Sequence, residues 1–212
     1  MKLNREKLML YAVTDRSCLR GQSLVQAVEG ALRGGAGLVQ LREKALDDRE
    51  LLEEADAVRT LCRKYGVPFV LNDRTELVLA ADADGVHVGQ SDMDCARARA
   101  VLGPDKLVGV SCRTVEQALA AQVAGADYLG VGAVFSTGTK PDAKPVTKET
   151  LKAICAAVEI PVVAIGGISE ENVEQLSGSG IAGVAVVSAL FARNDTEAAA
   201  RGLREKLKTV VG

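Results

Sequence analysis

One stretch of the chain, SLVQAVEGALRGGAGLVQLREKAL at residues 23–46, contains a complete repeating unit. Its first part, 23–35, has a helical pattern that closes on Gly34, and glycine suits the end of a helix. Its second part, 38–44, starts as an apolar run typical of a buried strand and then turns polar. The stretch therefore predicts a helix followed by a strand, with an amide, a guanidinium and an ammonium at the strand's end.

The same alternation of short apolar runs and longer helical patterns recurs along the chain. Strands are predicted at 8–15, 38–44, 68–73, 85–89, 107–111, 128–135, 161–167 and 183–190. Helices are predicted at 23–35, 51–66, 75–83, 95–103, 115–126, 148–158, 170–180 and 196–211. Such apolar strands are typical of a parallel sheet that helices cover. Eight units predict an α/β fold, a single (β/α)8 TIM barrel domain over 1–212, and a doubly wound open sheet is the alternative.

Composition excludes several classes of function. The net charge is −2, aromatic residues make up 3%, Trp is absent and neither sign of charge runs in blocks, so nucleic-acid binding is not expected. The longest apolar stretch, 181–192, is shorter than the roughly 20 residues of a membrane span. The N-terminal apolar run is too short for a signal peptide, and the five cysteines form no CxxC pair. These features predict a cytoplasmic protein without membrane or zinc.

Polar residues gather where the predicted strands end, and the active site of a barrel lies at the carboxyl ends of its strands. Arg42, Lys44 and Lys140 are positive and Asn72 is a neutral donor, which together suit a pyrophosphate. Alternate residues of a strand share a face, so Gln40, Arg42 and Lys44 are predicted to point in one direction. Solvated loops and helix caps are the alternative for part of this polar set.

Two carboxylates follow neighbouring strands. Asp73 and Asp92 end the third and fourth predicted strands, and hard oxygen ligands beside phosphate oxygens suit Mg²⁺. The alternative for both is capping of a helix N-terminus. His87 lies within the fourth strand with no second His or Cys that would complete a zinc set, so it is predicted to be a core or supporting residue.

A second anion site is predicted across the barrel. The sequence IGGIS at 165–169 ends the seventh strand, and VVSAL at 186–190 ends the eighth. Glycines allow backbone N–H groups to approach an anion, and barrels often hold a phosphate here, although a glycine pair also makes plain tight turns. Two facing anion sites predict two phosphorylated substrates, or one substrate with a phosphate at each end. The segment 136–145 between them has the composition of a closing flap.

Eight motifs, in this order, resemble the thiamine-phosphate synthase family over nearly the whole chain. They are YAVTD, QLREK, LND, GVHVGQ, GVS, GAVFSTGTKPDA, AIGGI and GVAVVSA. The resemblance implies a (β/α)8 barrel. It also implies that 4-amino-2-methyl-5-hydroxymethylpyrimidine pyrophosphate is joined to 4-methyl-5-(2-phosphoethyl)thiazole or its carboxylated form. The products would be thiamine phosphate and pyrophosphate, with one Mg²⁺ per active site.

The resemblance also implies roles for individual residues. The pyrimidine pyrophosphate would be bound by Gln40, Leu41, Arg42, Glu43, Lys44, Asn72, Ser111 and Lys140, of which Arg42, Lys44, Lys140 and Ser111 would be catalytic. Asp73 and Asp92 would hold the metal. The thiazole phosphate would be bound by Thr137, Gly138, Thr139, Gly167, Val187 and Ser188. Reaction would proceed by dissociative, Mg-assisted loss of pyrophosphate.

Two positions depart from the family's pattern. Ser136 stands where the family often has Pro, and Arg113 stands where His is common. The alternatives are a thiazole tautomerase-like relative, expected to place a catalytic His near position 113, and a non-catalytic thiamine-precursor binding protein. The Asn72-Asp73 pair and the Thr-x-Thr-Lys loop are both intact, which favours the synthase. The sequence is compatible with a homo-oligomer.

Overall fold

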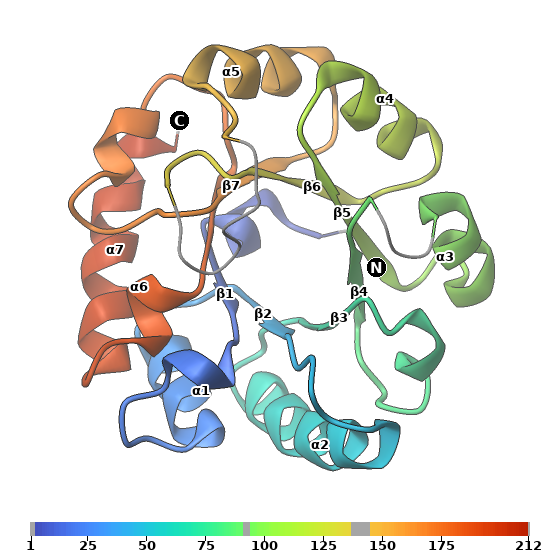
Figure 1. Ribbon diagram of the computed structural model, residues 1–212, viewed down its shortest axis with the longest axis vertical. Coiled ribbons are helices and arrows are strands. Elements are labelled where there is room, and N and C mark those ends of the chain that lie inside the picture. The colour runs from blue at the N-terminus through green and yellow to red at the C-terminus, as the bar shows by residue number, and fades with distance from the viewer. Residues whose placement is uncertain (1–2, 91–93, 137–144, 212) are drawn as a thin grey trace.

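The computed structural model describes residues 3–90, 94–136 and 145–211, and its strands form a closed parallel barrel in chain order (Figure 1). The strands are β1 (Leu10–Val13), β2 (Leu38–Leu41), β3 (Phe69–Asn72), β4 (Gly85–Val88), β5 (Leu107–Cys112), β6 (Tyr128–Gly132), β7 (Val162–Ile165) and β8 (Gly183–Val186). Pairing of β1 with β8, from Leu10 opposite Val184 to Ala12 opposite Val186, closes the ring. The predicted (β/α)8 class is confirmed.

Helices surround the barrel, as Figure 1 shows. They are α1 (Leu24–Arg33), α2 (Asp48–Lys64), α3 (Cys95–Leu102), α4 (Val115–Val123), α5 (Lys148–Ala157), α6 (Ser188–Phe191) and α7 (Thr196–Val210). Their starts follow capping chemistry: Ser23 with Gln26 begins α1, and Asp47 with Glu50 begins α2, each as a reciprocal capping box. Local sequence therefore fixes where these two helices start.

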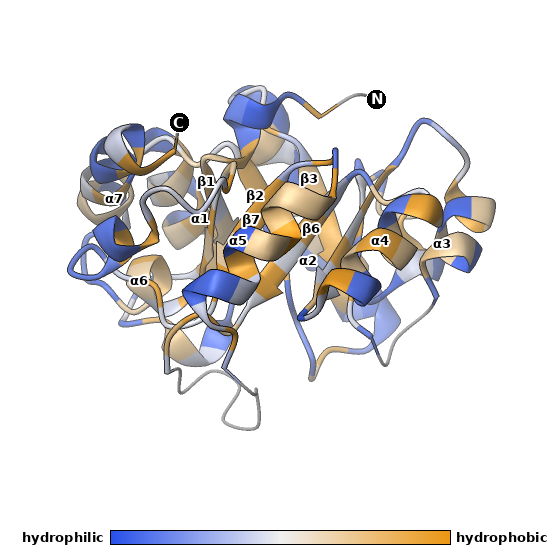
Figure 2. Ribbon diagram, turned by 90° about the horizontal axis from the view of Figure 1, so that it is seen from above, coloured by the Kyte–Doolittle hydropathy of each residue, from blue (hydrophilic) through white to orange (hydrophobic). Residues whose placement is uncertain are grey.

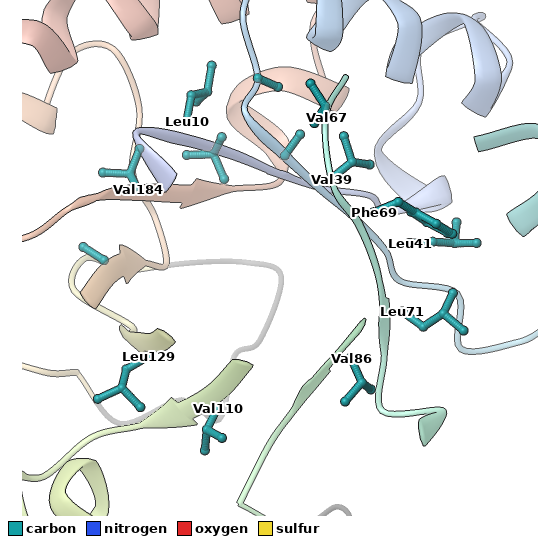
Figure 3. Close-up of a cluster of buried hydrophobic side chains, with 14 of the residues drawn as sticks. Leu10, Val39, Leu41, Val67, Phe69, Leu71, Val86, Val110, Leu129 and Val184 are labelled. Atoms are coloured by element: carbon teal, nitrogen blue, oxygen red, sulfur yellow. The ribbon is translucent and has the colours of Figure 1, made fainter. Parts of the chain in front are cut away.

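Side chains alternate strictly between the two faces of the barrel wall. On β2, Leu38 and Gln40 face the interior while Val39 and Leu41 join the apolar layer beneath the helices. Figure 3 labels ten residues of that outer layer, drawn from the strands β1 to β6 and β8 and from the approach to β3. In Figure 2 the strands are mostly apolar and the polar residues lie mainly on helices and loops.

The amino end of the barrel interior is packed with apolar side chains. The 3₁₀ helix η1 (Arg5–Leu8) brings Leu8 against Leu38 and Leu107, and all three are fully buried. Tyr11 and Tyr128 belong to the same interior cluster. The barrel is thus solid at this end, and the opposite end holds the cavity.

Two of the predicted helices are wrong. The segment 75–83 contains only the 3₁₀ helix η3 (Thr75–Leu77), because only twelve residues join β3 to β4, close to the minimum for a crossover. The segment 170–180 contains only η4 (Val173–Leu176). The side chain of Asn172, at its start, is bonded to the preceding loop instead of capping a helix, and Gly178 and Gly180 adopt positive φ after it.

The strands are also shorter than predicted. The strand predicted at 8–15 ends at Val13, because the Asp15 carboxylate accepts from the Ser17 amide and starts the 3₁₀ helix η2 (Arg16–Cys18). The strand predicted at 183–190 ends at Val186 and is followed by α6. None of the helices in the described part of the chain is long and apolar enough to cross a membrane.

Candidate active site

A cavity of about 400 Å³ opens at the carboxyl end of the barrel. Each of the eight strands contributes at least one residue to its lining, for example Tyr11 from β1, His87 from β4 and Ile165 from β7. The site is therefore built by the closure of the whole sheet, as expected for this fold.

Four of the predicted pyrophosphate residues line this cavity: Gln40, Arg42, Asn72 and Ser111. Arg42 follows β2 directly, and its backbone N–H donates to Thr14 Oγ1 at 2.9 Å. Its Nη1 donates to Asp15 Oδ2 at 2.9 Å, and its side chain is only 11% exposed. The carboxylate fixes the guanidinium at the cavity wall and leaves its other N–H donors available to a ligand.

The remaining QLREK residues lie elsewhere. Leu41 packs in the outer apolar layer, and Lys44 is exposed and does not line the cavity. The prediction that Gln40, Arg42 and Lys44 share one strand face is wrong, because β2 ends at Leu41. The substrate roles of Leu41 and Lys44 stay predictions.

Glu43 points toward α2 and away from the anion site. Its Oε2 lies 3.4 Å from Arg16 Nε, and Arg16 Nη2 lies 2.5 Å from Glu54 Oε1. The Glu43 side chain is 5% exposed, and its Oε1 has no hydrogen-bond partner among the residues that the structure describes. Burial, with the nearby Glu54 carboxylate, raises the pKa of Glu43 above its usual range. This orientation keeps a carboxylate from facing a bound pyrophosphate.

Asp73 occupies a strained backbone position just after β3, with φ of +63°. Its N–H donates to the His87 carbonyl at 2.9 Å, and its Oδ2 accepts from Asn72 Nδ2 at 2.6 Å. The N-cap residue of the 3₁₀ helix that follows is Arg74, and no side chain forms a capping hydrogen bond there. The N-cap residue of α3 is Asp94. Asp73 therefore does not cap a helix, which was the alternative role for Asp73 and Asp92. The N-cap of α3 is supplied by Asp94.

Of the two predicted metal ligands the structure describes only Asp73, which is not among the residues that line the cavity. Within residues 3–90, 94–136 and 145–211, no three His, Cys, Asp or Glu side chains gather into a metal-binding group. Mg²⁺ needs only one or two carboxylates, since water and substrate phosphates supply the rest. Asp92, the second predicted ligand, lies outside the described residues.

The wall formed by β7 and β8 combines apolar side chains, such as Ile165, with bare backbone at a glycine pair. Gly166 and Gly167 both adopt positive φ, at +99° and +66°, and both line the cavity together with Val187 and Ser188. A Cβ at position 167 would lie 2.3 Å from the Ser136 carbonyl oxygen and 2.8 Å from Phe135 Cβ. The glycine pair is thus a tight turn and a cavity wall at once. Thr137, Gly138, Thr139 and Lys140, predicted beside it, lie outside the described residues.

Sequence reasoning missed the residue that holds this turn. Asn172 Nδ2 donates to the Gly167 carbonyl at 2.8 Å, and Asn172 Oδ1 accepts from the Ser169 N–H at 2.9 Å. The available signal was an Asn three residues after a Ser at the end of a strand. The helical pattern at 170–180 includes this Asn and masks the signal.

Comparison with known proteins identifies the family. The model of the thiamine monophosphate synthase family matches residues 10–190. The chain belongs to the thiamine monophosphate synthase family. It is 52% identical over 196 residues to the thiamine-phosphate synthase of Ruminiclostridium cellulolyticum, covering 92% of this chain and 93% of that one. It is 47% identical to the Clostridium tetani thiamine-phosphate synthase, with the same coverage of both chains.

A solved structure agrees. The thiamine phosphate pyrophosphorylase from Pyrococcus furiosus superposes with a TM-score of 0.91 at 40% identity, covering 98% of this chain and 99% of that one. The resemblance predicted from the ordered motifs is confirmed, and the chain is a member of an enzyme family.

The structure also places the chain's departures from the family's pattern. Arg113 is exposed, lines the cavity and donates its N–H to Gln117 Oε1 at 2.8 Å. Ser136 is exposed beside Gly167. Cys112 is buried, and burial raises the pKa of its thiol to about 12, so at neutral pH it is an uncharged packing group. In this member of the family the single histidine is His87, on β4 and not near position 113.

Proposed function

We propose that the chain joins 4-amino-2-methyl-5-hydroxymethylpyrimidine pyrophosphate to 4-methyl-5-(2-phosphoethyl)thiazole, or to its carboxylated form, with release of pyrophosphate and, from the carboxylated form, of carbon dioxide as well. The supporting observation is one cavity with two unlike walls in a member of the thiamine monophosphate synthase family. A guanidinium and polar side chains line one wall, and a glycine turn with an adjoining helix start lines the other. One enclosed site can therefore hold two phosphorylated molecules end to end.

The side-chain wall suits the pyrimidine pyrophosphate. Arg42, fixed by Asp15, has guanidinium donors in the geometry that phosphate oxygens accept. Asn72 and Ser111 offer neutral hydrogen-bonding groups from β3 and β5. Lys44 and Lys140 would add positive charge to this site.

The backbone wall suits the thiazole phosphate. The Gly166-Gly167 turn has no side chains and lines the cavity together with Ser188 at the start of α6, so backbone N–H groups there would approach a phosphate. Thr137, Gly138 and Thr139 would complete this site from the segment after β6. No positive side chain is required, so the phosphate would be held mainly by backbone donors.

The proposed reaction needs no strong base. The electron-rich aminopyrimidine breaks its C–O bond to the pyrophosphate, the electron pair leaves with pyrophosphate, and the resulting methylene cation is captured by the thiazole nitrogen. Arg42, with Lys44 and Lys140, would neutralise the negative charge that develops on the leaving group. When bound at Asp73 and Asp92, Mg²⁺ would supply further positive charge to the same oxygens.

Holding the two substrates in one cavity supplies the remaining rate enhancement. Fixing the thiazole nitrogen near the pyrimidine methylene replaces a bimolecular encounter by a positioned one. Closure of the 136–145 segment would exclude water that would otherwise trap the cation.

A cytoplasmic location, predicted from composition, is proposed with this function.

One assay tests the proposal. The protein is mixed with both precursors and Mg²⁺, and thiamine phosphate and pyrophosphate are measured; the two products should appear in equal amounts. Binding of both precursors without product would favour the non-catalytic binding protein. Rearrangement of the thiazole precursor alone would favour the tautomerase-like alternative.

A further inference from the structure

Hydrogen bonds join five polar side chains across the barrel interior, at the floor of the cavity. We call them the polar network, and its members, in order, are Gln40, Tyr11, Tyr128, His87 and Ser111, from the strands β2, β1, β6, β4 and β5. Gln40 and Ser111, at its ends, are substrate residues in the proposed function. The three residues between them have no role in that function.

The contacts in the polar network are short and continuous. Gln40 Nε2 donates to the Tyr11 hydroxyl oxygen, which lies 2.9 Å from the Tyr128 hydroxyl oxygen. The Tyr128 hydroxyl oxygen lies 3.1 Å from His87 Nδ1. His87 Nε2 lies 2.9 Å from Ser111 Oγ. The three rings also contact one another, with centroids 5.5 to 6.4 Å apart.

Two glycines make room for these rings. A Cβ at Gly109 would fall 2.1 Å from Tyr128 Cζ and 2.6 Å from His87 Nδ1, and one at Gly130 would fall 3.1 Å from His87 Cε1. A Cβ at Gly109 would displace both rings, and a Cβ at Gly130 would press on the His87 ring. Glycine at these two positions of β5 and β6 therefore leaves the space that the polar network occupies.

Counting hydrogens assigns a direction to the polar network. Burial raises the pKa of Tyr11 and Tyr128 well above the usual range, so each keeps one O–H hydrogen. Tyr11 already accepts from Gln40. If Tyr11 donates to Tyr128, the Tyr128 hydrogen goes to His87 Nδ1 and both hydroxyl hydrogens are used.

The reverse direction would leave one hydroxyl hydrogen without an acceptor. If Tyr128 donated to Tyr11, the Tyr11 hydrogen would have no acceptor among the residues that the structure describes, on a side chain only 1% exposed. A buried donor without an acceptor is costly. The favoured direction makes His87 Nδ1 an acceptor and leaves its hydrogen on Nε2, which then donates to Ser111 Oγ.

We propose that Tyr11, Tyr128 and His87 are positioning residues, which hold His87 as its Nε2–H tautomer and thereby present the Ser111 hydroxyl as a donor to an acceptor nitrogen of the bound substrate. With its oxygen occupied by the His87 N–H, Ser111 is free to direct its own hydrogen into the cavity that it lines. The identity of that substrate as an aminopyrimidine rests on the proposed function. The assignment of the His87 tautomer does not rest on the proposed function.

The tautomer can be measured directly, because His87 is the only histidine of the chain. Full-length protein without a histidine tag is labelled with ¹⁵N in the imidazole ring, and two-dimensional NMR distinguishes the two nitrogens. The expected spectrum has a protonated Nε2 and an unprotonated Nδ1 at neutral pH. An Nδ1–H tautomer or an imidazolium would overturn the proposal, whatever the enzymatic activity.

A double-mutant cycle tests whether the polar network acts through Ser111. Tyr128→Phe should lower kcat/KM for the pyrimidine substrate by about tenfold, and by less than about twofold when Ser111 is already Ala. Tyr65→Phe is the matched control, since Tyr65 bonds Glu29 outside the barrel and should leave activity unchanged. Additive losses, or no loss from Tyr128→Phe, would overturn the proposal. A wild-type protein without synthase activity would refute the proposed function and leave the NMR result as the test.

Discussion

The cavity has two walls that lie across the barrel from each other and differ in the groups that line them. Along β2 to β5 the lining groups are side chains, with Arg42 and Asn72 among them. Along β7 and β8 the lining combines apolar side chains, such as Ile165 and Val187, with bare backbone at Gly166 and Gly167. A side-chain wall is sensitive to the loss of charge, whereas a backbone wall is sensitive to the addition of atoms. Each wall therefore has its own kind of disruptive substitution.

The largest effect is expected from Arg42→Met, which keeps the length of the side chain and removes its charge and donors. Turnover should fall at least about 100-fold, because developing charge on the leaving pyrophosphate loses its fixed partner. Thiazole phosphate should bind within about threefold of wild type, since the two walls do not share this residue. Steady-state pyrophosphate release and calorimetric titration of each ligand are the measurements.

Arg59→Met is the control for this variant. Arg59 is also a partly buried arginine paired with carboxylates, Asp56 and Asp82, but it lies on α2, outside the cavity. The Arg59→Met variant should bind both ligands with wild-type affinity and should keep the wild-type turnover. An Arg42→Met variant that loses both ligands equally would show that the two walls are not independent.

Next in size is Gly167→Val, which attacks the backbone wall. The new side chain would meet the Ser136 carbonyl and Phe135, at a φ of +66° that β-branched residues disfavour. Thiazole phosphate affinity should fall at least about 30-fold, with pyrimidine pyrophosphate binding within about threefold of wild type. Calorimetric titration of the folded variant gives both values.

Gly66→Val separates backbone strain from obstruction. Gly66 has a φ of +63°, and an added Cβ there would meet nothing within 4 Å. This variant should lose stability like Gly167→Val and keep both affinities. If Gly66→Val also weakened thiazole phosphate binding, the loss at position 167 would be a general consequence of strain. Loss confined to the pyrimidine ligand would mean that the two walls have been assigned the wrong way round.

A smaller effect is expected from Asp73→Asn, which replaces the carboxylate just after β3 by an amide of the same size. Turnover should fall about tenfold and the Mg²⁺ concentration for half-maximal rate should rise, because a neutral amide is a weaker ligand. Asp94→Asn is the control, since Asp94 caps α3 and Asn also caps helices well. An unchanged Mg²⁺ response in Asp73→Asn, with full activity, would remove Asp73 from the proposed metal site.

The smallest effect concerns Glu43, whose raised pKa makes stability depend on pH. A raised carboxyl pKa means that the folded state binds more protons than the unfolded state between the two pKa values, so stability falls as pH rises through that window. Glu43→Gln should therefore raise the melting temperature at pH 7 by about 1–3 °C and change it little near pH 4. Calorimetric melts at both pH values measure this.

Glu53→Gln is the matched control for the pH effect, because Glu53 is exposed on the same helix as Glu54. It should change the melting temperature equally little at both pH values. A Glu43→Gln variant that is less stable than wild type at pH 7 would mean that the ion pair with Arg16 outweighs the cost of burying the carboxylate.

The sequence predicted much of this molecule because periodicity is a local property. Apolar runs and helix patterns located all eight strands. The glycine pair at 166–167 predicted the backbone wall, and both glycines line the cavity. These results depend only on near neighbours along the chain.

Tertiary structure decided what periodicity could not. The strand at 38–44 reads as one run, but its ladder ends at Leu41, which separates exposed Lys44 from buried Gln40. Asn172 belongs to a helical pattern in the sequence, yet its side chain holds the Gly167 turn. Tyr11, Tyr128 and His87 come from three distant strands, and only closure of the barrel brings them within hydrogen-bonding distance. The physical reason is that a hydrogen bond between side chains depends on distance in space, which the order of residues along the chain does not encode.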